Sequence, residues 1–289
     1  MAKKIEEELL ELIESSVKLS CRNEKKIGVV FSAGLDSTII AFLASKFAEV
    51  NAYTVGEKNS EDIKYANEIK KINPNVNLNF IIKEIKTEDV KEILPKILNL
   101  INEPKPLQIS CAIPVYIAAN EAKKDGINLM LSGQGGDELF LGYYRYLQYI
   151  NDKEKIFDVM RRDIECAYAD NLNRDITMCK LNGVELAFPY MNKKLVEFAM
   201  KIPVELKIKE LFADEAYEEF SCVDNLNGKK FIRKYILRKI AKEIGIPKFI
   251  INRKKKALQY GSKSMKILKI IAKENGYSTI YDYLNSIKS

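Results

Sequence analysis

Short apolar runs alternate with amphipathic helical segments through the first half of the chain. The runs are rich in β-branched and aromatic residues and are bounded by polar turns. This predicts strands over residues 27–31, 50–55, 77–82 and 128–131. Helical spacing of apolar residues predicts helices over residues 37–47, 59–72, 88–101 and 115–124. Strands and helices that alternate in this way form βαβ crossovers, so we expect an α/β fold with a parallel twisted sheet and helices on both faces.

The two ends of the chain have a mainly helical pattern. Before the first strand, Ile5, Leu9 and Ile13 fall on one helical face, which predicts an amphipathic N-terminal helix. Beyond about Tyr143 the strand signals end and helical periodicity takes over. We therefore expect one domain with three parts: a helix in residues 1–24, an α/β core in 25–145, and a helical part in 146–289 that completes the site.

Small and polar residues follow the first strand at the point where a helix begins. The loop residues Ser32, Ala33 and Gly34 are poorly suited to a strand. Three good helix-start residues come next: Asp36, Ser37 and Thr38. A strand, a short loop and a helix N-terminus aim backbone N–H groups and a positive dipole end at one point, a geometry that binds phosphate. The loop lacks the spacing and the lysine of a Walker A motif, and the alternative is an ordinary βα turn.

A glycine-rich segment follows the fourth strand in the same way. Ser132, Gly133 and Gln134 precede the acidic residue Asp137. Glycine lets the backbone approach a ligand closely, and the carboxyl ends of parallel strands share one edge of the sheet. We therefore expect Asp36 and Asp137 to face one pocket, where two carboxylates beside a polyphosphate would hold Mg²⁺. The alternative is a glycine-rich turn with a helix-capping aspartate.

Composition narrows the chemistry of this pocket. The chain of 289 residues is 47% hydrophobic and 30% charged, which is typical of a globular protein. It contains no histidine, which excludes Ser-His-Asp and Cys-His catalysis and histidine-ligated metals. Carboxylates, lysine, backbone dipoles and an oxygen-ligated ion remain. The net charge of +7 suits an anionic substrate such as ATP.

Other features of the sequence exclude further classes of protein. Five cysteines without a CxxC pair indicate reduced, mostly buried thiols. No apolar run is long enough for a membrane helix, and the acid-rich N-terminal segment does not have the pattern of a signal peptide, so we expect a cytoplasmic protein. We interpret the basic cluster at residues 248–256 as a solvated face, which does not favour nucleic acid as a partner.

The polar motifs together resemble a known family. Residues 32–38, SAGLDST, resemble the SGGxDS loop of enzymes that cleave ATP to AMP and pyrophosphate. Residues 132–143, SGQGGDELFLGY, resemble the SGEGxDELFxGY signature of asparagine synthetase and β-lactam synthetase. Residues 53–57 resemble the second strand end of that family, residues 182–203 its GxExRxPFLD segment, and residues 233–261 its KxxLR and RxKxxF segments. The resemblance extends over residues 25–262 and implies the synthetase domain of this family.

The resemblance also implies roles for individual residues. It implies an ATP and pyrophosphate site at Ser32, Ala33, Gly34, Asp36, Ser37, Thr38, Ser132 and Gly133, with adenine held near Val55. It implies Mg²⁺ shared by Asp36 and Asp137. Its catalytic set would be Lys234, Gln134 and Asp137, with the ammonium of Lys234 near the α-phosphate. The implied reaction adenylates a small-molecule carboxylate with release of pyrophosphate, and ammonia or an amine then displaces AMP.

Several positions depart from the family pattern. Residue 2 is Ala2 and only a short helix precedes the first strand, so we expect no glutaminase domain. The nitrogen would come from free ammonia, an amine or a separate glutaminase subunit. Gln134 stands in place of a glutamate, Ala187 of an arginine and Asn192 of an aspartate. Because a neutral amide cannot titrate, Gln134 can only orient a nitrogen by hydrogen bonds, and the acceptor is left open.

Two other functions fit parts of the sequence. An RNA-modifying ATP-pyrophosphatase that adenylates a tRNA base is favoured by the basic residues 253–256, while the lack of a CxxC pair or an RNA-binding appendage argues against it. A nucleotide-binding partner subunit without acceptor chemistry is suggested by Gln134 and Ala187. The joint presence of Asp36, Asp137 and Lys234 argues against that second alternative.

Overall fold

Five parallel strands form the central sheet, in the order β3-β2-β1-β4-β5. The computed structural model describes residues 1–72, 77–101, 103–212 and 219–288. The strands are β1 (Lys26–Val30), β2 (Glu49–Gly56), β3 (Leu78–Glu84), β4 (Leu129–Ser132) and β5 (Glu185–Ala187). The order of the strands reverses at β1, because β2 pairs with one side of β1 and β4 with the other. Open α/β sheets bind their ligands at the carboxyl ends of the strands beside such a reversal.

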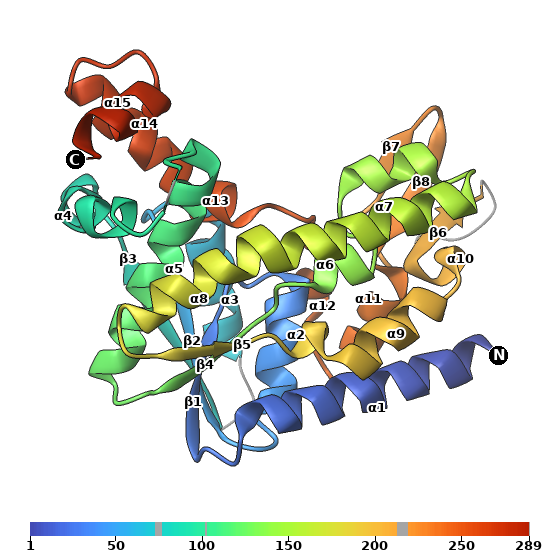
Figure 1. Cartoon of the computed structure of the whole chain (residues 1–289). Coiled ribbons are helices and arrows are strands. Elements are labelled where there is room, and N and C mark those ends of the chain that lie inside the picture. Colours follow the sequence, from blue (N-terminus) through green and yellow to red (C-terminus); the bar gives the residue numbers. More distant parts are fainter. Residues whose placement is uncertain (73–76, 102, 213–218, 289) are drawn as a thin grey trace.

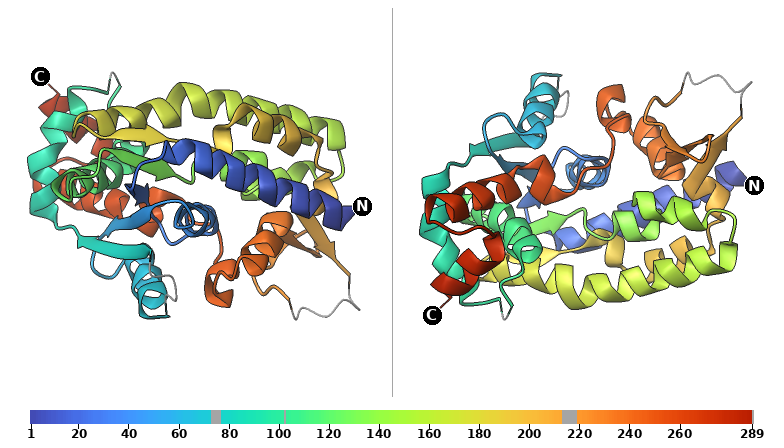
Figure 2. Two further views of the ribbon diagram at one scale, coloured as in Figure 1. Left: turned by 90° about the horizontal axis from the view of Figure 1, so that it is seen from below. Right: turned by 90° about the horizontal axis from the view of Figure 1, so that it is seen from above.

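Helices cover both faces of this sheet (Figures 1 and 2). One core contains residues of α1 (Ala2–Cys21), α2 (Leu35–Ala44) and α3 (Glu61–Ile72). The other contains residues of α4 (Thr87–Leu98), α5 (Pro106–Lys124), α8 (Asn173–Lys180), α14 (Ser264–Glu274) and α15 (Ile280–Ile287). Alternation along β4 separates the two cores, because Leu129 and Leu131 join the first and Met130 joins the second.

The remaining elements are mostly short and connect these layers. In chain order they are α6 (Gly136–Leu139), η1 (Tyr144–Tyr149), α7 (Lys153–Cys166), η2 (Ala167–Leu172), η3 (Pro189–Met191), α9 (Lys193–Lys201), α10 (Val204–Lys207), α11 (Tyr235–Glu243), α12 (Lys248–Ile251) and α13 (Leu258–Gly261). The segments η1 and η3 are 3₁₀ helices, whereas η2 is a π-helical turn. A second, antiparallel sheet has the order β6-β8-β7. Its strands are β6 (Ile208–Leu211), β7 (Asp224–Leu226) and β8 (Lys229–Arg233).

The fold class predicted from the hydrophobic pattern is confirmed, because the sheet is parallel and helices pack on both faces. The expectation that strands end near Tyr143 is wrong, since β5 and the second sheet follow it. Each of these strands has only three to five residues, which is too short for a period of two to stand out. Helix α5 also begins at Pro106, earlier than the predicted residue 115, with proline in the first turn where its missing N–H costs nothing.

The cysteines agree with the prediction of reduced, mostly buried thiols. All five thiols are free, and four of them are buried while Cys166 is exposed. Burial raises the pKa of the Cys21 thiol to about 11, so this thiol stays protonated at neutral pH. Among the helices in the described ranges, none combines the length and the apolar character needed to cross a bilayer.

Candidate active site

A cavity of about 480 Å³ opens at the carboxyl ends of β1 and β4. Its walls come from the loops after these strands, from α5, from the run α7–η2–α8, and from residues 253–259. Most of the residues predicted for the site line it: Ser32, Gly34, Asp36, Ser37, Ser132, Gly133, Gln134, Asp137 and Lys234. The other three are not part of the described lining. Ala33 and Thr38 are fully buried, and Val55 belongs to the apolar core that contains α5.

The loop after β1 is shaped by one left-handed residue. Ala33 has a φ of 53°, a conformation that costs a non-glycine residue about 1–2 kcal/mol. This geometry explains why the resembling motif has glycine there. The turn lets the Gly34 N–H donate to the Ser32 hydroxyl oxygen at 3.3 Å, and the Thr38 hydroxyl donates to the Gly34 carbonyl at 2.8 Å. The first N–H groups of α2 remain directed out of the helix, as an anion site requires.

The loop after β4 lies directly against this helix N-terminus. A Cβ atom on Gly133 would lie 2.7 Å from the backbone nitrogen of Ser37, and one on Gly136 would lie 2.7 Å from Cγ of Asp36. Only glycine allows so close an approach. The two loops that the sequence placed after separate strands therefore form one surface.

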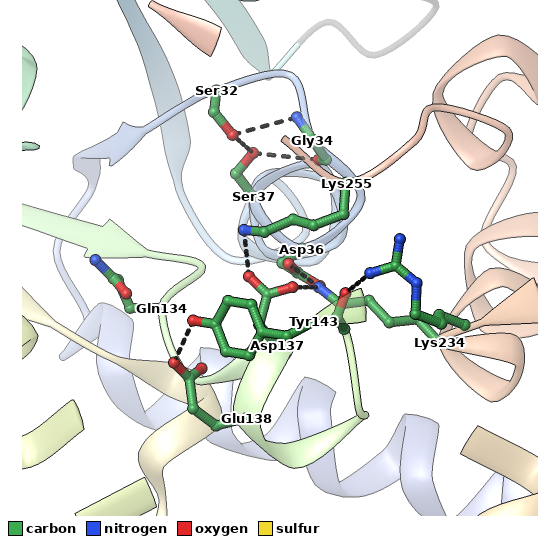
Figure 3. A network of polar contacts seen from close by, with 12 residues as sticks. Ser32, Gly34, Asp36, Ser37, Gln134, Asp137, Glu138, Tyr143, Lys234 and Lys255 are labelled. Carbon is green, nitrogen blue, oxygen red and sulfur yellow. Dashed lines mark hydrogen bonds and ion pairs between the residues drawn. The ribbon is translucent and has the colours of Figure 1, made fainter. Parts of the chain in front are cut away.

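Two lysines converge on two buried carboxylates between these loops (Figure 3). Lys234 Nζ donates to Asp36 Oδ2 and lies 2.7 Å from Asp137 Oδ1, and Lys255 Nζ pairs with Asp137 Oδ2. Lys234 has only 4% of its side chain exposed, whereas Lys255 has 27%. A side chain on Gly142 would collide with this cluster, because its Cβ would lie 2.2 Å from Cε of Lys234. The glycine thus makes room for the lysine.

The two carboxylates respond differently to this environment. Burial raises the pKa of Asp36, and the neighbouring Asp137 adds to that effect against the attraction of Lys234. Burial also acts on Asp137, but the ammonium groups of Lys234 and Lys255 outweigh it and hold its pKa below the usual range. Among the described residues, none donates a hydrogen bond to the buried Oδ1 atom of Asp36. The cluster therefore has an acceptor available for a further cation.

The interpretation of residues 248–256 as a solvated face holds for the exposed Lys248, Lys254 and Lys256 but is wrong for the buried Arg253, and residues 253–256 line the cavity. Arg253 is buried, and its guanidinium donates to the carbonyl of Ser32 and to Asp62 Oδ1, both at 2.5 Å. Lys255 reaches Asp137. A run of charges looks the same in sequence whether it faces water or a carboxylate. The usable signal was the RxK part of the resembling motif, which falls on these two residues.

Other polar groups that line the cavity already pair with one another. The Tyr143 hydroxyl donates to Glu138 at 2.7 Å, and burial, with the nearby Asp137, raises the pKa of Glu138. The Gln134 amide donates to Asp175 Oδ2 at 2.8 Å. Asp175 was not predicted from the sequence, although it lines the cavity next to Arg174.

Comparison with known proteins shows the family of the chain. The family model described as asparagine synthase matches residues 8–158 and 147–275. The chain belongs to the asparagine synthase family. A putative asparagine synthetase [glutamine-hydrolyzing] of Methanocaldococcus jannaschii is 36% identical over 96% of this chain and 53% of its own length. Asparagine synthetase B [glutamine-hydrolyzing] of Escherichia coli is 29% identical over 68% of this chain and 37% of its own length. The chain thus spans about half the length of the archaeal relative and less of the bacterial one.

Of the three departures from the asparagine synthase pattern at positions 134, 187 and 192, one lies at the cavity. Asn192 is the N-cap of α9, and its side chain accepts from the Lys194 N–H at 3.0 Å, a role that aspartate fills equally well. Ala187 ends β5 beside Leu131 of β4 and is not among the lining residues described. Gln134 lines the cavity. Of these three positions, the change at 134 is therefore the one that alters the lining of the cavity.

Proposed function

We propose that this protein is an ATP-dependent ligase that activates a carboxylate as an acyl-adenylate and converts it to an amide with ammonia or an amine. The observation that carries the proposal is the lysine and carboxylate cluster beside the loop after β1. Membership of the asparagine synthase family, and the names of the relatives, support the same class of reaction. Residues 25–145 would supply the ATP-binding core, and residues 146–289 would complete the site.

In the first step, a carboxylate oxygen forms a bond to the α-phosphorus of ATP. Pyrophosphate leaves with the electron pair of the broken phosphoanhydride bond. The backbone N–H groups at the start of α2, with the Ser32 and Ser37 hydroxyls, would bind the departing pyrophosphate. Lys234 would stabilise the charge that develops at the α-phosphate. Such a step needs positioning and charge neutralisation more than a strong base, which suits a chain without histidine.

Asp36 and Asp137 would hold Mg²⁺ together with oxygens of the substrate. The fit is supported by the buried Asp36 Oδ1 atom, which accepts no hydrogen bond from the described residues. Two carboxylates beside a triphosphate suit this ion, which is usually bound by few protein ligands and by substrate phosphates. In the described part of the chain, no cluster of three or more acidic or cysteine ligands forms a metal cage. The ion would neutralise charge on the phosphates.

The present pairing balances the charges of the cluster before ATP arrives. Two ammonium groups face two carboxylates, so neither sign is buried alone. When Mg-ATP binds, we expect Lys234 and Lys255 to turn from the carboxylates to the phosphates.

In the second step, a nitrogen attacks the acyl carbon of the adenylate. AMP leaves with the electron pair of the broken carbon–oxygen bond, and the nitrogen loses a proton to water. The nitrogen would come from free ammonium, from an amine, or from a separate glutaminase subunit.

The proposal is tested by incubating the pure protein with Mg-ATP, ammonium chloride and a panel of amino acids and other small carboxylic acids. We expect AMP and pyrophosphate to form only when an effective acid is present. Replacement of ammonium by glutamine tests the nitrogen source. AMP formation with bulk tRNA but with no small acid would contradict the proposal and favour RNA modification. Failure to bind ATP in calorimetry would remove both enzymatic functions.

A matched pair of variants ties the activity to this cavity. Asp36→Asn should abolish AMP formation, because it removes a carboxylate expected to hold the metal. Asp152→Asn changes an exposed carboxylate that caps α7 outside the cavity and should leave the activity unchanged. Equal activity in both variants would contradict the role of Asp36.

A further inference from the structure

A π-helical turn interrupts the long helical run that forms one wall of the cavity. Helix α7 continues through η2 into α8, and this run crosses the middle of Figure 1 in yellow-green. A π turn adds a residue to the helical repeat and shifts which side chains face inward, and such turns occur frequently at functional sites. Ala167 at the start of the turn and Asn171 near its end both line the cavity, as do Arg174 and Asp175 just after it.

The buried pair that follows this turn uses its polar atoms on itself and its neighbours. Arg174 Nε and Nη2 lie 2.8 and 2.7 Å from Asp175 Oδ1, and the two side chains are 6% and 3% exposed. Arg174 Nη1 donates to Gln108 at 2.8 Å and to Asn171 at 3.1 Å. Asp175 Oδ2 is left to accept the amide of Gln134 at 2.8 Å. The opposite charges of this pair compensate each other, so it offers no net charge to a ligand.

This contact fixes the orientation of the Gln134 amide. A carboxylate that is paired with a guanidinium can only accept, so the NH₂ group of Gln134 must face Asp175. The carbonyl oxygen Oε1 then lies on the opposite side of the amide. Gln134 lines the cavity, and among the described residues none donates to Oε1. A hydrogen-bond acceptor with a defined direction is therefore available beside Gly133, which touches the start of α2.

We propose that Asp175 is a positioning residue that holds Oε1 of Gln134 toward the cavity, where it binds an N–H group of the incoming nitrogen nucleophile. The inference rests on the proposed ligase function and assigns the nitrogen subsite within it. The subsite takes ammonia or a primary amine, because an oxygen acceptor can orient an N–H bond while the nitrogen lone pair attacks the acyl carbon. Gln134 itself takes no proton, and the proton released in amide formation goes to water.

The kinetic test compares Asp175→Asn with the wild type in the two half-reactions. The new amide can donate to Gln134 and let the side chain turn over, which removes the acceptor from the cavity. We expect the KM for ammonium chloride to rise about tenfold, the effect of one lost hydrogen bond. Pyrophosphate exchange with the same acid should stay within twofold of wild type. An unchanged KM for ammonium would overturn the proposal.

A second pair of variants separates positioning from folding. Asp175→Asn leaves Arg174 without its carboxylate, so a folding defect would lower both half-reactions together. Gln134→Glu alone places two carboxylates in contact and should also raise the KM for ammonium. The double variant Gln134→Glu/Asp175→Asn restores a donor at 175 and an oxygen acceptor at 134, and should bring that KM back toward wild type. A double variant no better than either single one would contradict the assignment. Glu6→Gln, a buried acid paired with Lys239 away from the cavity, is the folding control.

An activity-independent test distinguishes failure of this inference from failure of the proposed function. In protein labelled with ¹⁵N-glutamine, the side-chain amide signal of Gln134 is identified by its loss in Gln134→Glu. We expect Asp175→Asn to shift this signal, and ammonium chloride to perturb it more than sodium chloride does. If the wild type forms no AMP with any acid but both shifts appear, the subsite stands and the ligase function fails. If neither shift appears in an enzyme that forms amides, the function stands and this inference is wrong.

Discussion

The two halves of the cavity handle charge in opposite ways. The half at the carboxyl ends of β1 and β4, named the phosphate half for its proposed role, gathers Lys234, Lys255 and Arg253 around the loop after β1. The half along α7, η2 and α8, named the acceptor half, pairs Arg174 with Asp175 and leaves the neutral oxygen of Gln134 as a hydrogen-bond acceptor. Under the proposed function, binding of ATP calls for countercharges, whereas attack by a neutral nitrogen calls for direction. The difference suggests that the two chemical steps depend on separate sets of residues.

The largest effect is expected from removal of Lys234, the lysine that pairs with both carboxylates of the phosphate half. Lys234→Met should lower pyrophosphate exchange by about 10³-fold, because the charge at the α-phosphate loses its fixed ammonium. The Asp36 and Asp137 carboxylates would also face each other without Lys234, which breaks a buried ion pair and should lower the free energy of unfolding by about 3–5 kcal/mol. Denaturant unfolding and isotope exchange measure the two effects.

The control for this variant is Lys242→Met, which removes an exposed lysine paired with Glu219 at the far end of α11. It should leave both quantities unchanged. If Lys234→Met retained pyrophosphate exchange within tenfold of wild type, Lys234 would not supply the main countercharge of the phosphate half.

The next effect concerns a buried lysine that has no carboxylate partner, in contrast to Lys234. Lys207 is fully buried, and its Nζ lies 3.3 Å from Met160 Sδ; among the described residues no carboxylate pairs with it. Burial lowers its pKa from 10.5 to about 7. Between these values the unfolded chain binds a proton that the folded protein does not, so this residue makes stability rise with pH from about 7 to 10.5.

Lys207→Met should therefore stabilise the protein, by several kcal/mol at pH 6 and by progressively less as the pH approaches 10. Urea unfolding of both proteins across this range measures the difference. A gain that did not depend on pH would show that packing against Met160, rather than the buried charge, sets the cost of Lys207.

A smaller effect is expected from the second cation of the phosphate half. Lys255→Met should weaken the binding of Mg-ATP about tenfold in calorimetry, because one partly exposed ammonium is lost from the phosphates. The KM for ammonium should not change, since Lys255 does not contact Gln134 or Asp175. A change in that KM alone would break the separation between the two halves.

The smallest effect should come from the backbone of the phosphate loop. Ala33→Gly relieves a left-handed alanine and should raise the free energy of unfolding by about 1 kcal/mol. Asn227→Gly changes a left-handed residue in the β7–β8 turn and should gain less, because asparagine tolerates this conformation. Equal gains at both positions would argue that Ala33 is not strained.

The phosphate half could largely be predicted from the sequence because its residues follow strands directly. The loop from Ser32 to Ser37 and the segment around Asp137 are each continuous in the chain, and strand order brings them together. Lys234 lies far along the chain and was placed only through the family resemblance. Lys255 was not singled out as a separate residue, because it lies in a run between Lys254 and Lys256, and such a run is usually a solvated face.

The acceptor half could not be predicted because its geometry depends on an irregular helix. Asp175 and Arg174 look like surface residues of an amphipathic helix when a regular repeat is assumed. The π turn changes that repeat, and the residue types of η2 do not predict a π turn. The short strands β5 to β8 were missed for a related reason, since their pairing partners are remote and their own patterns are too brief.

Because of the π turn, the deletion or insertion of one residue in η2 can change the cavity wall as much as a substitution can. Loss of one residue from η2 would favour a regular α-helix and rotate α8 relative to α7 by about 100°. Arg174 and Asp175 would leave the cavity wall together, and Gln134 would lose its partner. The sheet and the loop after β1 would be untouched by that change. A single-codon deletion could thus alter nitrogen selection in one step while the machinery for nucleotide activation stayed intact.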